Sequence, residues 1–253
     1  MKHDAKKNDN KKDKGYELIY GVHPILELLK AKRRKLVTLY TTKPTPHAWR
    51  LIQPLLTKAT QIQYVERSVL SRMTQTTDHQ SFVALATPFV IRKKFFEPKI
   101  APFLLLLDSI HDPRNLGALL RSAYCTGIDG VILCGRNSAP LGATALKSSA
   151  GLAEHLDIYE APTAQAAIEL LKKEQYGVYL ATLSGKNATA LTYQKPLCLV
   201  IGNESTGIAQ PLLSQGIQIR LAQRSSDISY NASVAGGILL FIIANQIETF
   251  EKA

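Results

Sequence analysis

Apolar and polar positions along the C-terminal part of the chain predict a buried strand followed by an amphipathic helix. Five consecutive apolar residues, Phe103 to Leu107, lead into Asp108, as in a buried parallel strand. After a polar loop, four apolar residues follow at i, i+3, i+4 and i+7: Leu116, Leu119, Leu120 and Ala123. We expect Arg114, Gly117 and Arg121 on the opposite side of this helix, where an anion or a ribose approaches the carboxyl end of the strand.

Similar strand and helix patterns alternate from there to the end of the chain, which favours an α/β domain with a parallel sheet. The predicted strands are 103–108, 130–134, 156–159, 177–182, 197–201 and 217–221. The predicted helices are 115–126, 142–150, 163–174, 207–214 and 231–249.

The N-terminal part predicts a second, smaller α/β domain over residues 15–88. A helix around Ile25 to Leu29, strands at 36–41, 61–65 and 82–86, and a helix over 49–56 fit its pattern. Residues 1–14 contain almost no apolar side chain and are expected to form a disordered basic tail. Residues 89–101, with a basic triplet and Pro98, are expected to be a linker to the domain 102–253.

The positive charge of the chain is concentrated in its first two-fifths. The net charge is +11; residues 15–101 hold fourteen Lys and Arg against five Asp and Glu, and residues 102–253 hold eleven against twelve. One basic cluster consists of Lys30, Lys32, Arg33, Arg34 and Lys35. Another consists of Arg92, Lys93 and Lys94. A polyanion held by the N-terminal part explains this distribution, because Lys and Arg contacts to phosphates dominate nucleic-acid affinity. Solubility alone also explains it.

Several classes of function lose support from the sequence. Cys125, Cys134 and Cys198 are few and odd in number, which predicts reduced core thiols in a cytoplasmic protein. The six histidines show no metal-ligand spacing, and no early apolar segment resembles a signal peptide. The apolar segment around Ile238 to Ala244 is too short to span a bilayer. Walker A, G-x-S-x-G and G-x-G-x-x-G motifs are absent.

Two further polar motifs follow predicted strands. The strand 197–201 leads into Gly202-Asn203-Glu204-Ser205-Thr206-Gly207, where the glycines allow close approach of a ligand to the backbone. Alternatively, Ser205 or Thr206 simply caps the next helix. Ser229-Tyr230-Asn231-Ala232-Ser233 precedes the last helix, where Ser229 or Asn231 is either a ligand contact or a helix cap. A weaker motif, residues 147–151 with Glu154 and His155, either lines the same crevice or ends a helix at Gly151.

Together, these motifs resemble the SpoU/TrmH family of RNA ribose 2′-O-methyltransferases, which belong to the knotted SPOUT methyltransferases. The resemblance rests on Asn115-Leu-Gly117 with Arg121, on the motif 202–207, and on the motif 229–233. Residues 20–24 resemble the start of the small substrate domain of the 23S rRNA guanosine methyltransferases. The chain departs from many relatives at Tyr230 and Ala232, where they have Leu and Val, and at Ser81, where they have Gly.

The resemblance implies a C-terminal trefoil-knotted domain, a homodimer, S-adenosylmethionine as cofactor and RNA as substrate, with neither metal nor membrane. It implies cofactor contacts by six residues: Thr182, Gly202, Leu221, Tyr230, Asn231 and Ala232. It implies a catalytic group of Arg121, Asn115, Glu204, Ser229 and Asn231, in which Glu204 orients Arg121 and Asn115 binds ribose or phosphate. The RNA-binding residues expected with them are Lys32, Arg33, Arg34, Arg92, Lys93, Lys94 and Arg114.

Two other functions stay open from the sequence. A tRNA ribose methyltransferase of the same fold would carry the same motifs. An RNA-binding module without activity is disfavoured, because Asn115, Arg121, Glu204 and Asn231 are all present.

Overall fold

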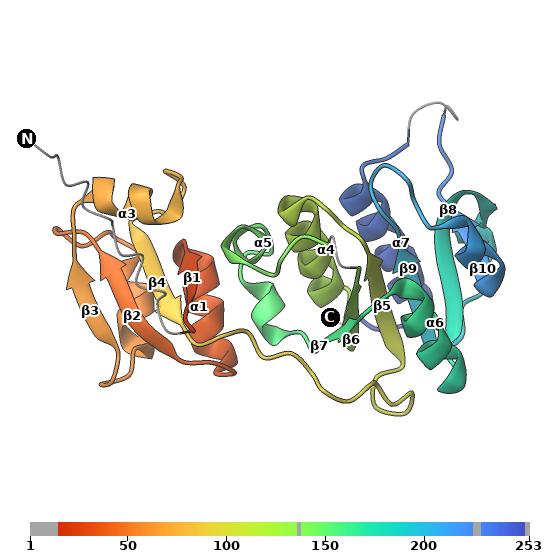
Figure 1. Ribbon diagram of the computed structural model, residues 1–253, viewed down its shortest axis with the longest axis horizontal. Coiled ribbons are helices and arrows are strands. Elements are labelled where there is room, and N and C mark those ends of the chain that lie inside the picture. Colours follow the sequence, from red (N-terminus) through yellow and green to blue (C-terminus); the bar gives the residue numbers. More distant parts are fainter. Residues whose placement is uncertain (1–14, 136–137, 225–228, 251–253) are drawn as a thin grey trace, which may run out of the picture.

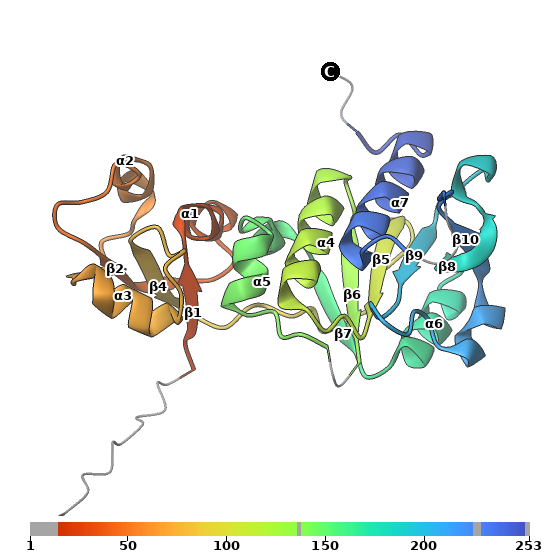
Figure 2. The same ribbon diagram turned by 90° about the horizontal axis from the view of Figure 1, so that it is seen from above.

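The computed structural model describes residues 15–135, 138–224 and 229–250, and the predicted tail 1–14 lies outside them. Within those ranges the chain forms a small four-stranded sheet and a larger six-stranded sheet, each with its own helices. The two units lie side by side along the long axis of the molecule (Figures 1 and 2). This division agrees with the two α/β regions expected from the sequence.

The six-stranded sheet is entirely parallel and has the order β10-β8-β9-β5-β6-β7. Its strands are β5 (Phe103–Asp108), β6 (Gly130–Cys134), β7 (Ile158–Ala161), β8 (Gly177–Asn187), β9 (Leu197–Ile201) and β10 (Ile217–Arg220). β5 and β9 are the two central strands, and both are almost fully buried. This explains why their sequences are continuous apolar runs without alternation.

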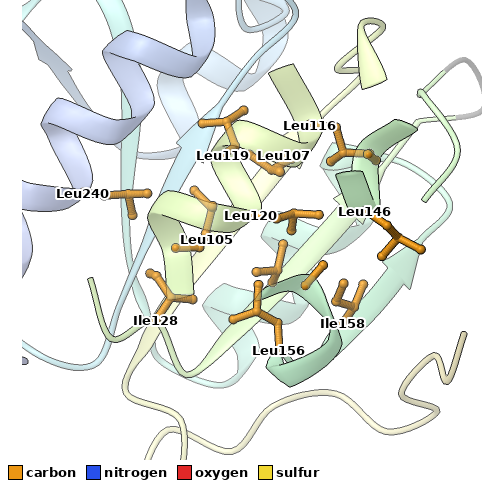
Figure 3. Close-up of a cluster of buried hydrophobic side chains, with 14 of the residues drawn as sticks. Leu105, Leu107, Leu116, Leu119, Leu120, Ile128, Leu146, Leu156, Ile158 and Leu240 are labelled. Carbon is orange, nitrogen blue, oxygen red and sulfur yellow. The ribbon is translucent and has the colours of Figure 1, made fainter. Parts of the chain in front are cut away.

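Helices cover both faces of this sheet. They are α4 (Pro113–Cys125), α5 (Ala143–Ser148), α6 (Ala164–Lys173) and α7 (Ala232–Gln246), with short 3₁₀ turns η2 (Leu152–His155), η3 (Ala188–Ala190) and η4 (Gln210–Gln215). Alternate β5 residues enter separate cores: Leu105 and Leu107 pack with α4 and α7 (Figure 3), and Leu104 and Leu106 pack with α6.

The predicted stripe of α4 is confirmed, but the predicted position of Gly117 is wrong. Leu116, Leu119, Leu120 and Ala123 are all buried. Gly117 is also buried, because α5 crosses α4 there: a Cβ on Gly117 would lie 2.3 Å from the carbonyl oxygen of Ala145. Gly117 thus serves helix packing and does not face a ligand.

The small sheet has the order β1-β4-β2-β3. Its elements are β1 (Glu17–Tyr20), α1 (Val22–Ala31), β2 (Leu36–Thr41), α2 (Trp49–Ile52), η1 (Gln53–Leu55), β3 (Gln61–Tyr64), α3 (Arg67–Thr74) and β4 (Phe82–Ala86). β1 and β2 pair antiparallel with β4, and β3 is a parallel, exposed edge strand. α1 and β1 lie next to η2 and α5 of the larger unit (Figure 2).

Several local expectations differ from the structure. β1 and α3 are not among the predicted elements. β1 has four residues, and of the eight α3 residues only Leu70 is buried, so the apolar pattern of both is weak. The predicted helix 207–214 is only the 3₁₀ turn η4, with Pro211 at its start and Gly216 after it. Cys134 and Cys198 are buried as expected, but Cys125 is exposed near the end of α4.

Residues 89–101, expected to be a linker, pack along the edge of the larger sheet. Arg92 forms a parallel bridge with Tyr159 of β7, and its backbone N–H donates to the Ile158 carbonyl over 2.7 Å. Phe96 is buried over Gly130, whose Cβ would lie 2.2 Å from the phenyl ring. The segment therefore has an ordered structural role.

Ser81, one of the departures from relatives, has a backbone conformation that favours glycine. It is buried and has a φ of 62°. A residue with a Cβ pays about 1–2 kcal/mol there. Replacing Ser81 with glycine should therefore raise stability by up to about 1 kcal/mol, after the extra freedom of glycine in the unfolded chain is subtracted. A rise in melting temperature of about 2–4 °C is expected by calorimetry for a chain of this size.

The matched control is Ser81→Ala, which removes the hydroxyl but keeps the strain. It should not raise the melting temperature. A glycine variant no more stable than the alanine variant would show that the conformation of Ser81 costs nothing here.

No helix in the described ranges is both long enough and apolar enough to cross a bilayer.

Candidate active site

A pocket of about 360 Å³ in the larger unit is lined by residues of the second and third motifs, 202–207 and 229–233. Its lining comes from β8, from the loop after β9, from η4, from the segment after β10 and from the start of α7. Five of the six predicted cofactor residues line it: Thr182, Gly202, Leu221, Tyr230 and Ala232. Two predicted catalytic residues, Glu204 and Ser229, also line it. Asn231 lies between lining residues but contacts other groups.

The loop after β9 is held by Asn203 in a tight turn. Its Oδ1 accepts hydrogen bonds from the backbone N–H groups of Ser205 (2.9 Å) and Thr206 (3.1 Å), and its Nδ2 donates to the Ser109 carbonyl over 2.7 Å. Asn203 and Gly207 also pair through their backbones. Ser205 and Thr206 therefore do not cap a helix; they belong to a loop closed by Asn203.

Gly202 is required by the closeness of this turn. A Cβ on Gly202 would lie 2.4 Å from the backbone carbon of Gly207. Gly207 itself has a φ of 67°, which glycine adopts without a steric penalty. The two glycines therefore bring the backbone of the loop against the pocket wall.

β8 provides a second wall through an interruption in its pairing. Tyr179 and Leu180 pair with Ile217 and Gln218 of β10, but the next β10 residue, Ile219, pairs with Lys186. Residues 181–185 are thus displaced from the ladder, and four of them line the pocket. The hydroxyl of Thr182 accepts from the Gly185 N–H over 3.1 Å and closes this excursion.

α7 begins at the pocket because Asn231 caps it. The Asn231 Oδ1 accepts from the Ser233 N–H over 2.8 Å. Gly236 lets the helix pack against α4, since a Cβ there would lie 2.3 Å from the Leu119 Cδ2. The capping interpretation of Asn231 is confirmed, and the cap leaves its Nδ2 available for another contact.

Hydrogen bonds join the three motifs through Asn115, Glu204 and Asn231. The Asn231 Nδ2 donates to the Asn115 Oδ1, and the Asn115 Nδ2 donates to the Glu204 Oε1, both over 3.2 Å. Glu204 also accepts from the backbone N–H groups of His111 and Asp112, each over 3.1 Å. Partial burial raises the pKa of the Glu204 carboxyl, but these donors outweigh it and hold the pKa below its usual range. Glu204 is therefore an ionised anchor that fixes the loop before α4.

Arg121 does not contact Glu204, so the expected orienting role of Glu204 is not seen. The donors to Glu204 are backbone and amide groups of residues 111, 112, 115 and 203. Arg121 is exposed on α4, and within the described ranges its side chain forms no hydrogen bond or ion pair with another residue. Its guanidinium lies on the exposed side of α4.

The predicted RNA-binding residues divide into exposed and paired groups. Lys32, Lys93, Lys94 and Arg114 are exposed, although Arg114 has a 3.3 Å contact to Asp112. Arg33 and Arg92 are partly exposed, and both form ion pairs with Asp157.

Arg34 departs from the expectation, because its side chain is only 1% exposed. It forms ion pairs with Glu154 and Glu17. A guanidinium in this position has no free face for a phosphate.

Residues 147–155 lie between the two units, so the suggestion that they line the crevice is wrong. The Lys147 Nζ donates to the Gln80 Oε1 over 2.8 Å, and the His155 Nε2 lies 2.8 Å from the Glu27 Oε2. Glu154 is paired with Arg34. α5 ends through left-handed residues at Ala150 and Gly151, which agrees with the helix-end interpretation.

Sequence reasoning missed several pocket residues. Leu183 and Ser184 lie in the β8 excursion, Gln210 and Leu213 in η4, and Gln223 after β10. Gly185 lies inside β8 but beyond the predicted strand 177–182, so the sequence pattern did not show that it interrupts a strand. Nothing in the sequence marked the others. Within 15–135, 138–224 and 229–250, no three His, Cys, Asp or Glu side chains gather as metal ligands do.

Comparisons with known proteins agree with this arrangement. Residues 102–241 match the SpoU rRNA methylase family, and residues 18–90 match the family of RNA 2′-O ribose methyltransferase substrate-binding domains. A 23S rRNA (guanosine-2′-O-)-methyltransferase, RlmB of Photorhabdus laumondii, is 31% identical over 91% of this chain and 98% of its own length. An uncharacterized tRNA/rRNA methyltransferase of Synechocystis is 33% identical over 91% of this chain, which spans 62% of that relative.

A solved structure shows the same fold. The SpoU methyltransferase AviRb from Streptomyces viridochromogenes, solved in complex with the cofactor AdoMet, has a TM-score of 0.76. It is 19% identical, and the alignment covers 92% of this chain and 91% of AviRb. The family match extends over more than half of the chain and includes all three sequence motifs, at residues 115–121, 202–207 and 229–233. The chain therefore belongs to the SpoU rRNA methylase family, as its motifs predicted.

Proposed function

We propose that this protein methylates the ribose 2′-oxygen of a guanosine in 23S rRNA, with S-adenosylmethionine as methyl donor. The observation that carries the proposal is the chain of hydrogen bonds from Asn231 through Asn115 to Glu204, beside a pocket of ligand size. The guanosine and the 23S rRNA are taken from the RlmB relatives, which are about 30% identical along nearly their whole length.

The pocket fits the proposed cofactor. Its walls combine apolar side chains, such as Leu221 and Leu239, with the exposed backbone of the loop 202–207. A Cβ at Gly202 would fill space that the close backbone turn needs. We assign cofactor binding to the five lining residues at 182, 202, 221, 230 and 232. Asn231, as the N-cap of α7, holds its neighbours Tyr230 and Ala232 at the pocket. When bound, the cofactor supplies an electrophilic methyl group.

The protein's own groups position and polarise the attacking hydroxyl. Asn115 is held by Glu204 on one side and by Asn231 on the other, so its amide is oriented in advance for a ribose or phosphate oxygen. Arg121, on the same helix, has no ion-pair partner among the described residues. A guanidinium stays protonated in proteins and is no simple base, so we assign Arg121, together with an RNA phosphate, to positioning and polarising the attacking hydroxyl. Ser229 contributes a hydroxyl to the pocket wall.

The small unit and the ordered segment after it form the proposed RNA-binding surface. Residues 15–88 would be the substrate domain, 89–101 the connection and 102–253 the methyltransferase domain. Lys32, Lys93 and Lys94 are exposed there, whereas residues 102–253 hold eleven Lys and Arg against twelve Asp and Glu and contribute no net positive charge. An rRNA substrate implies that the enzyme works in the cytoplasm. The trefoil knot of the larger domain stays a prediction from the resemblance.

We further propose a homodimer that uses the outer face of α7. This helix is apolar around its whole circumference, a pattern typical of helices buried on all sides. Its Val234, Ile238 and Phe241 are nonetheless exposed, at i, i+4 and i+7, and Phe241 stacks on Phe250. A second copy of the chain would cover this stripe and bury it next to the pocket.

Replacing Phe241 with glutamate should convert the dimer into a monomer, because a charge would be buried at the centre of the stripe. Sedimentation analysis would measure the change as a halved mass at micromolar concentration. The control is Ile100→Glu, since Ile100 is more exposed still and does not belong to the α7 stripe. A Phe241→Glu variant that sediments like the parent would refute the assignment of this face.

The proposed substrate is tested by offering purified enzyme and labelled methyl donor to three RNAs: 23S rRNA, 16S rRNA and total tRNA. Incorporation into 23S rRNA alone is expected. Incorporation into tRNA would replace the proposal with a tRNA methyltransferase, and retained RNA binding without incorporation into any RNA would indicate a binding module.

A further inference from the structure

A buried ion pair connects the small unit to the methyltransferase unit. Arg34, in the loop between α1 and β2, and Glu154, in η2, have side chains that are 1% and 2% exposed. The Arg34 Nη2 donates to the Glu154 Oε1 over 2.6 Å, and its Nε donates to the Glu154 Oε2 over 3.0 Å. This two-pronged geometry is specific in direction as well as in distance.

The remaining donors of Arg34 hold the start of the connecting segment. Its Nη1 donates to the Thr87 carbonyl over 3.2 Å and to Glu17 of β1, and its Cζ lies 5.2 Å from the centre of the Phe89 ring. One guanidinium thus joins β1, the segment after β4 and η2. Three segments, two of the small unit and one of the larger unit, therefore meet at this residue.

Further contacts surround the buried pair. Arg33 and Arg92 both form ion pairs with Asp157, at 2.7 and 3.1 Å, and His155 lies 2.8 Å from Glu27. The backbone of α1 approaches Gly151 so closely that a Cβ there would lie 2.7 Å from the Pro24 Cα. Contacts of this density are not those of a domain on a flexible tether.

We propose that Arg34 and Glu154 are positioning residues that hold the small, RNA-binding unit at a fixed distance and orientation from the methyl-transfer pocket. The proposal rests on the proposed function for its consequence, which is that docking selects the ribose that reaches the pocket. Lys32 and its exposed neighbours bind the RNA; Arg34 acts only through the placement of the unit that carries them.

The energetics of buried ion pairs suggest the variants. Removing one partner leaves an uncompensated buried charge, whereas replacing both partners with apolar residues of similar volume is often neutral. Burial raises the pKa of the Glu154 carboxyl even with Arg34 beside it, because a carboxylate is poorly solvated there. Loss of Arg34 would leave this buried carboxylate without its main cationic partner. Arg34→Met should therefore open the interface, and Arg34→Met with Glu154→Leu should close it again.

The docking is measured by spin-label distances in the full chain. Labels at Arg72→Cys on α3 and Glu169→Cys on α6 report across the units; Cys125→Ser removes the exposed native thiol, and unlabelled protein in excess suppresses distances between protomers. A single narrow distance distribution is expected for the parent and for the double variant, and a broad one for Arg34→Met. If Arg34→Met does not fold, Glu154→Gln gives the milder loss of charge.

Kinetics then separate positioning from RNA contact. For Arg34→Met, kcat should fall on the order of 10- to 100-fold, with RNA and cofactor affinities within about twofold of the parent. The double variant should recover kcat. Lys32→Met is the matched control: it should weaken RNA binding, reduce its salt dependence and leave the distance distribution narrow.

A broad distribution in the parent, or a narrow one in all variants, would overturn the proposal. So would a double variant that docks but stays as slow as Arg34→Met, because Arg34 would then act on the RNA directly. If the parent methylates no RNA, the proposed function fails, while the spin-label distances still decide whether the units are docked.

Discussion

Replacing Arg121 with alanine should lower kcat for methyl transfer by about 10²–10³-fold, the usual effect of removing a group that stabilises transition-state charge. Arg121 is exposed on α4, where its guanidinium is not committed to another residue in the described part of the chain. It is outside the pocket lining, so cofactor affinity should be unchanged. Single-turnover transfer of labelled methyl and calorimetric titration of the cofactor measure the two effects.

Arg114 on the same helix is the matched control. Its side chain is 79% exposed and pairs with Asp112, so Arg114→Ala should affect RNA affinity and not the rate of the bound complex. Arg121→Lys should recover little activity, because an ammonium cannot reproduce the planar fork of a guanidinium. Full transfer by Arg121→Ala would remove Arg121 from the catalytic group.

Replacing Gly202 with alanine should weaken cofactor binding without unfolding the protein. The new Cβ would lie 2.4 Å from the backbone carbon of Gly207, so the loop 202–207 would have to move. Overpacking of this kind costs about 1–3 kcal/mol. If that cost falls on the bound state, the cofactor dissociation constant rises roughly 5- to 150-fold, which calorimetric titration would detect.

Gly142→Ala is the control for this substitution. A Cβ on Gly142 would meet no atom within 4 Å, so its cofactor affinity should equal that of the parent. An unchanged affinity in Gly202→Ala would mean that the cofactor does not depend on the turn, and the assigned pocket would be wrong.

Much of the fold could be predicted because burial alone determines it. The runs Phe103–Leu107 and Leu197–Ile201 are apolar on both faces, and they form the two central strands. The edges were less predictable: β1 has only four residues, α3 buries only Leu70, and η4 ends after six residues at Gly216. Local patterns carry little information where burial is slight.

The site was predictable to the extent that its residues follow strands. Asn115, Glu204 and Asn231 are 89 and 27 residues apart in the chain, yet they meet because parallel strands end at the same sheet edge. Arg34 shows the limit of such reasoning. Its basic neighbours suggested RNA, but pairing with Glu154 across 120 residues leaves no local trace in the sequence.

The central claim, ribose methylation of a guanosine in 23S rRNA, is tested most directly by mass spectrometry of the nucleosides. 23S rRNA lacking modification would be treated with the enzyme and S-adenosylmethionine, digested completely and compared with untreated RNA. The account predicts one new product, 2′-O-methylguanosine, at a single position, formed about 10²–10³-fold more slowly with Arg121→Ala. A methyl group on a base, or no new methylated nucleoside, would contradict it.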